Sequence, residues 1–92
     1  MSKVYIINIE FRLDIDDTMF STLKKGFTSF EQAKDYVLNT LIPNEKKLSW
    51  IRNYPESELE FSQNIEENYL WWECQYDDYD KYTSITIEEI LL

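Results

Sequence analysis

An alternation of apolar and polar residues runs along the first part of the chain. The even positions from Asn8 to Asp16 are polar, and the odd positions are apolar: Tyr5, Ile7, Ile9, Phe11, Leu13 and Ile15. A period of two is typical of a strand with one face on a core. Because Val4 and Ile6 are also apolar, we expect the strand to begin inside a sheet. Its acidic end, Asp14 to Asp17, is expected to turn.

Helical spacing replaces this alternation further along the chain. Apolar residues there recur at intervals of three and four: Phe30, Ala33, Val37, Leu38 and Leu41. Thr28 and Glu31 match a capping box, and Pro43 limits the other end, so we predict a helix from Ser29 to about Ile42. Its opposite side is polar, which predicts that one apolar stripe of the helix lies on the sheet.

Two segments are compatible with more than one structure. Asp17 is a candidate cap for a short helix that ends before Gly26, and an irregular loop is the alternative. Asn44 to Tyr54 favours a second short helix before the break at Pro55, with a strand as the alternative.

The rest of the chain predicts strands. We expect a short strand at Glu58–Ser62 and longer ones at Tyr69–Tyr76 and Tyr82–Ile90, the last two joined by a hairpin turn at Asp77–Lys81. The β-α-β-β order predicts an α+β fold, in which an antiparallel sheet of three or four strands carries one main helix on one face. The 92 residues suffice for one hydrophobic core, so we predict a single domain, residues 1–92.

Several kinds of chemistry lack the residues that they need. With no histidine and only Cys74, the chain offers neither a typical zinc site nor a base-activated thiol, and we interpret Cys74 as a buried strand residue. A single glycine leaves no phosphate-binding loop. The acidic run from Asp14 to Asp17 fails the calcium-loop pattern, because Met19 and Lys25 stand where glycine and glutamate are required. We therefore expect no metal, no cofactor and no catalysis.

Net charge narrows the choice of partner. The formal charge is −9, and residues 54–92 carry eleven acids against the single base Lys81, whereas residues 1–53 are nearly neutral. Such an acidic surface would repel phosphate, so direct binding to nucleic acid is disfavoured and a basic protein partner is favoured. No leader and no apolar run of about 20 residues is present, so we expect a cytoplasmic protein without membrane contact.

Aromatic residues are interleaved with the acids between Tyr69 and Tyr82. Trp71 and Trp72 are neighbours, so in a strand they point to opposite faces and only one joins a core under a single helix. A sheet covered on both faces is the alternative. Because Trp and Tyr dominate interface hot spots, we predict a partner-binding hairpin. Its residues are Trp71, Trp72, Tyr76, Asp77, Asp78, Tyr79 and Asp80.

In size, charge and tyrosine-plus-acid composition the C-terminal forty residues resemble small acidic phage-encoded inhibitors, including anti-CRISPR proteins and DNA mimics. The resemblance implies carboxylates that stand where phosphates would sit, and stoichiometric occupation of an enzyme's basic groove in the host cytoplasm. The target would be a nuclease or a CRISPR effector. No residue roles follow from the resemblance, because no motif carries it.

Three alternatives to such an inhibitor remain open at this point. An immunity protein or antitoxin would use the same acidic surface against a cationic toxin. A small carboxylate-based hydrolase would need two acids in one pocket. A homodimer would pair through the exposed tryptophan.

Overall fold

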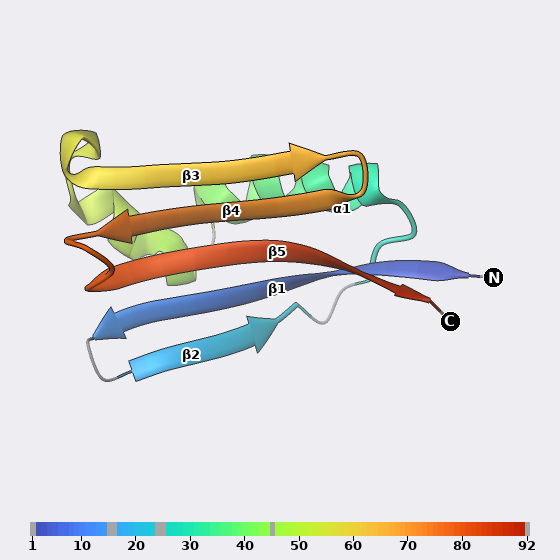
Figure 1. Cartoon of the computed structure of the whole chain (residues 1–92), viewed down its shortest axis with the longest axis horizontal. Helices are drawn as coiled ribbons and strands as arrows, with labels where there is room; N and C mark the ends of the chain where they lie inside the picture. Colours follow the sequence, from blue (N-terminus) through green and yellow to red (C-terminus); the bar gives the residue numbers. More distant parts are fainter. Residues whose placement is uncertain (1, 15–16, 24–25, 45, 92) are drawn as a thin grey trace.

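A computed structural model describes residues 2–14, 17–23, 26–44 and 46–91. Within these ranges five strands form one antiparallel sheet, in the spatial order β2-β1-β5-β4-β3. The strands are β1 (Lys3–Asp14), β2 (Asp17–Thr22), β3 (Leu59–Glu66), β4 (Tyr69–Tyr76) and β5 (Lys81–Leu91). Figure 1 shows the sheet face-on, with helix α1 behind it and both termini at the same end of the molecule. The α+β class is therefore confirmed.

One continuous helical segment covers the back of the sheet. It consists of α1 (Phe30–Tyr36), a π-helical stretch η1 (Val37–Leu41) and α2 (Ile42–Asn44). Its buried side chains, spaced by three and four residues, face the sheet as the sequence predicts: Phe30, Ala33, Val37 and Leu41. The helix thereby fixes which face of the sheet is covered and which is free.

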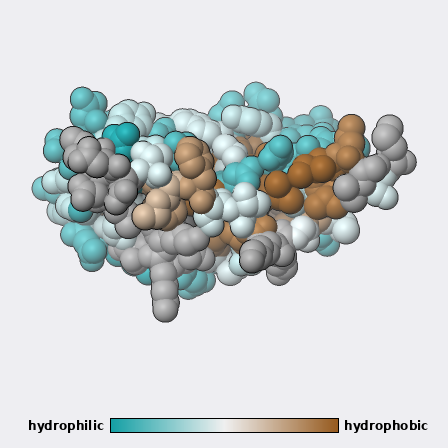
Figure 2. Space-filling model, turned by 90° about the horizontal axis from the view of Figure 1, so that it is seen from below, coloured by the Kyte–Doolittle hydropathy of each residue, from teal (hydrophilic) through white to brown (hydrophobic). Residues whose placement is uncertain are grey.

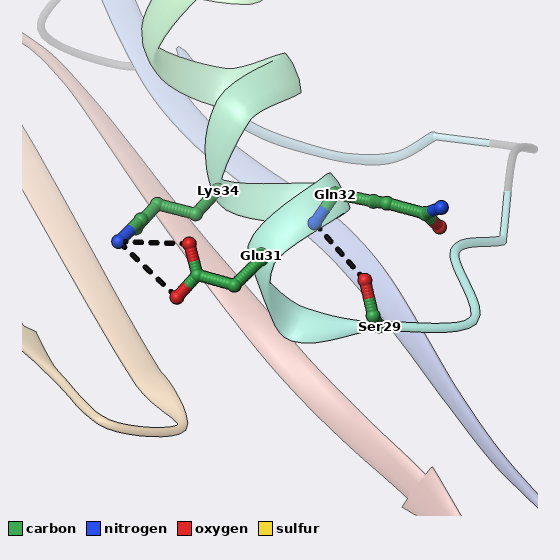
Figure 3. Close-up of polar contacts among 4 residues, drawn as sticks. All are labelled: Ser29, Glu31, Gln32 and Lys34. Atoms are coloured by element: carbon green, nitrogen blue, oxygen red, sulfur yellow. Dashed lines mark hydrogen bonds and ion pairs between the residues drawn. The ribbon is translucent and has the colours of Figure 1, made fainter.

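The cap of this helix lies one residue later than the sequence predicts. Ser29, and not Thr28, is the cap residue, and its Oγ accepts a hydrogen bond of 3.2 Å from the backbone N–H of Gln32 (Figure 3). Glu31 in the first turn of α1 pairs with Lys34 in its last turn at 3.2 Å. Ser and Thr are both favoured N-cap residues, so adjacent Thr28 and Ser29 leave the start ambiguous by one position.

The prediction of three or four strands is wrong, because β2 occupies the segment where we expected a short helix or a loop. It forms a hairpin with β1, in which Phe20 lies opposite Glu10 and Met19 opposite Phe11. Just beyond β2, the N–H of Leu23 donates to the carbonyl of Ile7 at 3.0 Å. Pairing with the long β1 satisfies the backbone groups of this Thr- and Phe-containing segment more fully than one helical turn would.

Between helix and sheet lies a 3₁₀ segment, η2 (Lys46–Asn53), followed by the short η3 (Glu56–Glu58). Within 46–53, the part of the predicted 44–54 segment that η2 covers, the helical alternative is therefore confirmed as a 3₁₀ helix, and the strand alternative is wrong. Trp50 is buried, and its indole Nε1 donates to the hydroxyl of Thr83 at 2.8 Å. This bond satisfies the two polar groups inside the apolar core.

The C-terminal strands follow the prediction closely. The predicted bounds of β4 are those observed, β5 is one residue longer at each end, and β3 runs on to Glu66 instead of stopping at Ser62. A four-residue turn, 77–80, joins β4 to β5 and is closed by the Tyr76–Lys81 pair. Among the described residues no helix is both long and apolar enough to span a membrane.

Candidate protein-binding face

The side of the sheet opposite the helix has no covering layer in the described chain, and we call it the open face (Figure 1). Strand alternation and register place on it the even-numbered residues of β1, β2, β3 and β5 and the odd-numbered residues of β4. One row across it runs Phe20, Glu10, Ser84, Glu73. Residues from both ends of the chain thus meet on a single surface.

Acids and aromatics share this face. The glutamates are Glu10, Glu60, Glu66, Glu73 and Glu88, and the aromatics are Phe20, Tyr69, Trp71 and Tyr82. In the described part of the chain, Arg12 is the only basic residue on the face. Phe20 is 77% exposed and Tyr69 is 42% exposed. An uncovered sheet face with large exposed rings is typical of an interaction surface.

Among the described residues, the contacts of Arg12 are with aromatic and uncharged groups and not with a carboxylate. Its guanidinium lies 5.4 Å from the centroid of the Tyr82 ring, its Nη1 donates to the carbonyl of Tyr79 at 3.3 Å, and its Nε donates to the hydroxyl of Thr18 at 3.4 Å. Tyr82 in turn donates its hydroxyl to Glu10 Oε1 at 2.9 Å. Arg12 therefore fixes the position of the β4–β5 turn and of the Tyr82 ring.

Tyr79 folds from the turn back over the open face. Its backbone N–H donates to Gln75 Oε1 at 2.9 Å, and its ring meets the ring of Tyr82 edge-on at 6.0 Å. Gln75 continues the network, because its Nε2 donates to Glu60 Oε2 at 2.7 Å. The acidic and aromatic side chains at this end are thus ordered by one another, which lowers the entropy lost when a partner binds.

In this row, the ionised form of Glu73 is disfavoured by its surroundings. Its pKa is raised first by burial and second by the charge of Glu10, while the hydrogen bond from Tyr79 acts in the opposite direction. Ser84 stands between the two glutamates in the sheet register. The row therefore holds two carboxyl groups that repel each other, a pattern found at functional surfaces.

The structure divides the seven predicted partner-binding residues between the two sides of the sheet. Trp71 lies half-buried on the open face, whereas Trp72 is only 7% exposed and packs in the core. Tyr76 belongs to the covered side, where its ring stacks on Tyr54 at 4.1 Å. Trp71 and Tyr79 are therefore available on one surface, and Trp72 and Tyr76 build the fold.

The three aspartates of the predicted site all lie in the turn. Asp77 and Asp78 are exposed, and Asp80 is half-buried. Asp77 and Asp78 have φ of 51° and 56°, and Tyr79 has φ of 69°. Aspartate tolerates this left-handed region better than most residues. The backbone conformation of the turn is therefore sufficient to explain why aspartate occurs at positions 77 and 78.

Sequence reasoning missed the contribution of the N-terminal hairpin to the open face. Glu10, Arg12 and Phe20 lie there beside the C-terminal acids. The even positions of the first alternating segment carried a usable signal for Glu10 and Arg12, because they had to point away from the core. Phe20 could not be placed while its segment was expected to be helix or loop.

The interpretation of Cys74 as a buried strand residue is confirmed. It lies in β4 with no exposed surface, and burial, followed by the charge of Glu73, raises the pKa of its thiol to about 11. Such a thiol stays protonated near neutral pH. No group of three or more candidate metal ligands occurs within the described ranges. The acidic run at Asp14–Asp17 lies partly outside them.

Comparison with protein-family models, with curated proteins and with solved structures gives no match.

Proposed function

We propose that this protein is a stoichiometric inhibitor that lays its open face on the basic groove of a nucleic-acid-processing protein, such as a nuclease or a CRISPR effector. The observation that carries the proposal is the combination of Glu10, Glu60, Glu66, Glu73 and Glu88 with exposed aromatic rings on one uncovered sheet face. Carboxylates attract the Lys and Arg side chains of such a groove, and the rings supply apolar contact area.

The sheet suits a mimic of nucleic acid because it holds its charges on a fixed lattice. Neighbouring strands lie about 4.8 Å apart, and residues two apart on a strand are separated by about 7 Å. The open-face glutamates occupy some of these positions, so the strands fix the separations between their carboxylates. The exposed Asp77 and Asp78 of the turn add carboxylates beyond the end of β4.

The proposal is tested by capture from bacterial lysate on the immobilised protein, followed by competition. A basic nuclease or effector that is retained at low salt and released by duplex DNA supports it. A retained protein that is a toxin encoded beside this gene would instead identify an immunity protein, which would use the same face. A chain that retains only itself, with a dimer mass in solution, contradicts the inhibitor.

Paired variants then locate the interface. With the captured partner, the double substitution Glu60→Gln, Glu66→Gln should lower the association rate about fivefold or more and weaken its salt dependence. Trp71→Ala should mainly raise the dissociation rate. The matched control, Glu31→Gln with Asp35→Asn, removes the same charge from the helix. Equal losses in the two double variants would rule out the open face as the binding surface.

The hydrolase alternative finds less support. It needs two carboxyl groups in one pocket with separated pKa values. The hollow that the open face contains is lined by a single acid, Glu10.

A further inference from the structure

A hollow of about 290 Å³ opens on the face between β2, β1 and β5. Open-face side chains that line it are Asn8, Glu10, Phe20, Thr22, Ser84 and Thr86. Figure 2 views the molecule from the β2 side and shows a small, pale apolar patch on the left and a larger, more strongly apolar patch toward the end where both termini lie. The volume lies at the lower limit of small-ligand pockets, so the hollow suits one side chain and not a larger ligand.

The polar groups of the hollow present acceptors. The hydroxyl of Thr22 donates to Asn8 Oδ1 at 2.8 Å, and Asn8 Nδ2 donates to Glu88 Oε2 at 3.0 Å. These two donors are used inside the network, whereas the hydroxyls of Ser84 and Thr86 can either donate or accept. Glu10 adds a carboxylate, which Tyr82 holds by one oxygen at 2.9 Å. Because Glu10 is the charged group of this lining, the hollow favours a group that donates hydrogen bonds and carries a positive charge.

The charges and the aromatic ring around the hollow indicate which chemical group would bind in it. Glu73 lies across Ser84 from Glu10, so two carboxyls border the same row, and Arg12 is held by Tyr82, Tyr79 and Thr18 instead of by them. Phe20, 77% exposed, stands at the end of the row and offers a ring face. A cation over an aromatic ring beside a carboxylate is a favourable combination, and a planar guanidinium satisfies both partners best.

We infer that this hollow receives the guanidinium of one arginine side chain from the basic partner protein, stacked on Phe20 and hydrogen-bonded to Glu10. The source of the arginine rests on the proposed function. The preference of the hollow for a guanidinium does not, because it follows from the lining groups alone.

The test uses L-argininamide as the probe and records amide chemical shifts of the labelled protein by NMR. Shifts should concentrate at Glu10, Phe20, Thr22, Ser84 and Thr86. Citrullinamide has the same shape and the same α-amino group but an uncharged ureido side chain, and it should leave these amides unmoved. Glu10→Gln, which retains an acceptor for Tyr82, should weaken argininamide binding about tenfold, and Phe20→Ala about two- to fivefold.

Glu66→Gln is the matched control, because it removes one open-face charge from the distant β3 and should leave binding unchanged. Ser84→Lys is the second test, since it supplies a cation within the row and should abolish the argininamide shifts while the spectrum stays folded. Equal weakening by Glu10→Gln and Glu66→Gln would overturn the inference. It would mean that argininamide is attracted to the whole acidic face and not to the hollow. Absence of shifts at tens of millimolar probe would also overturn it. Failure to capture any partner protein would count against the proposed function alone.

Discussion

Among single residues, Glu73 on the open face is held in surroundings that disfavour its charged form. Its pKa is raised above the ordinary value of 4.5 by burial and by Glu10. A carboxyl with a raised folded-state pKa favours the protonated form in the folded protein, so its ionisation opposes folding. That opposition is fully present above the raised pKa and vanishes as the pH falls to 4.5.

We predict that Glu73→Gln raises the free energy of unfolding at about pH 7 and that this gain shrinks as the pH is lowered toward about 5. Urea denaturation at both pH values measures the effect. Glu66→Gln, which removes the same charge from an exposed position, should show a smaller gain at neutral pH. A Glu73→Gln protein that is less stable than the wild type at pH 7 would mean that the Tyr79 hydrogen bond outweighs the burial of Glu73.

The orientation of Trp71 and Trp72 could be predicted only in part from the sequence. The adjacent tryptophans had to point to opposite faces, and this is confirmed. Which of them is buried depends on the register of β4: Trp72 lies opposite Ile85, and Trp71 lies opposite Thr86. Register comes from pairing across the sheet, and the local sequence of β4 is apolar enough to fit either way.

At the scale of elements, the β4–β5 turn joins two strands through three successive residues of positive φ, Asp77, Asp78 and Tyr79. No glycine occurs among them, although glycine adopts this region without steric cost. The Asp80 N–H to Asp77 carbonyl bond of 3.2 Å and the Tyr79 N–H to Gln75 bond compensate for the strain. The turn is therefore held in place by its own contacts.

We predict that Asp78→Gly raises the free energy of unfolding by up to about 1 kcal/mol, and that Asp78→Val lowers it by about 1–2 kcal/mol. Asp78 is exposed, so packing contributes little to either change. Asp78→Asn is the control for charge, because asparagine also tolerates positive φ. If Asp78→Asn were as stabilising as Asp78→Gly, removal of charge and not backbone relief would be the cause.

Elements with strong periodicity were predicted from the sequence, and those that depend on a neighbour were not. The long alternation of β1 and the helical spacing from Phe30 onward each bury a continuous stripe, so their type was correct. β2 is a short edge strand of Asp17–Thr22, and it becomes a strand because β1 lies beside it. Its own sequence holds too few residues for either period to be distinguished.

At the scale of the whole molecule, the charge asymmetry of the sequence becomes a spatial one. Four acids of the C-terminal strands fall on the open face, Glu60, Glu66, Glu73 and Glu88, and Glu10 joins them from β1. The acidic surface was therefore predictable from the sequence. The row that unites Phe20, Glu10 and Glu73 was not, because it requires the order β2-β1-β5-β4.

A net charge of −9 on a body of about 43 × 25 × 20 Å makes self-repulsion a property of the entire fold. At about 0.01 M salt the screening length is roughly 30 Å, so most charges on the molecule interact, whereas at about 1 M it is only about 3 Å. Repulsion between like charges destabilises the compact state more than the expanded one. Added salt should therefore stabilise the protein.

We predict that raising sodium chloride from about 0.01 M to about 0.5 M increases the stability by about 1 kcal/mol, which for a domain of this size is a rise in Tm of about 4–8 °C. Thermal unfolding followed by circular dichroism measures it. Sodium chloride is preferred to sulfate, because sulfate strengthens apolar burial whatever the charge. The Glu60→Gln, Glu66→Gln variant should gain less from salt than the wild type, since it starts with less repulsion on the open face. An equal gain in both proteins would show that Glu60 and Glu66 contribute no measurable repulsion to the folded state.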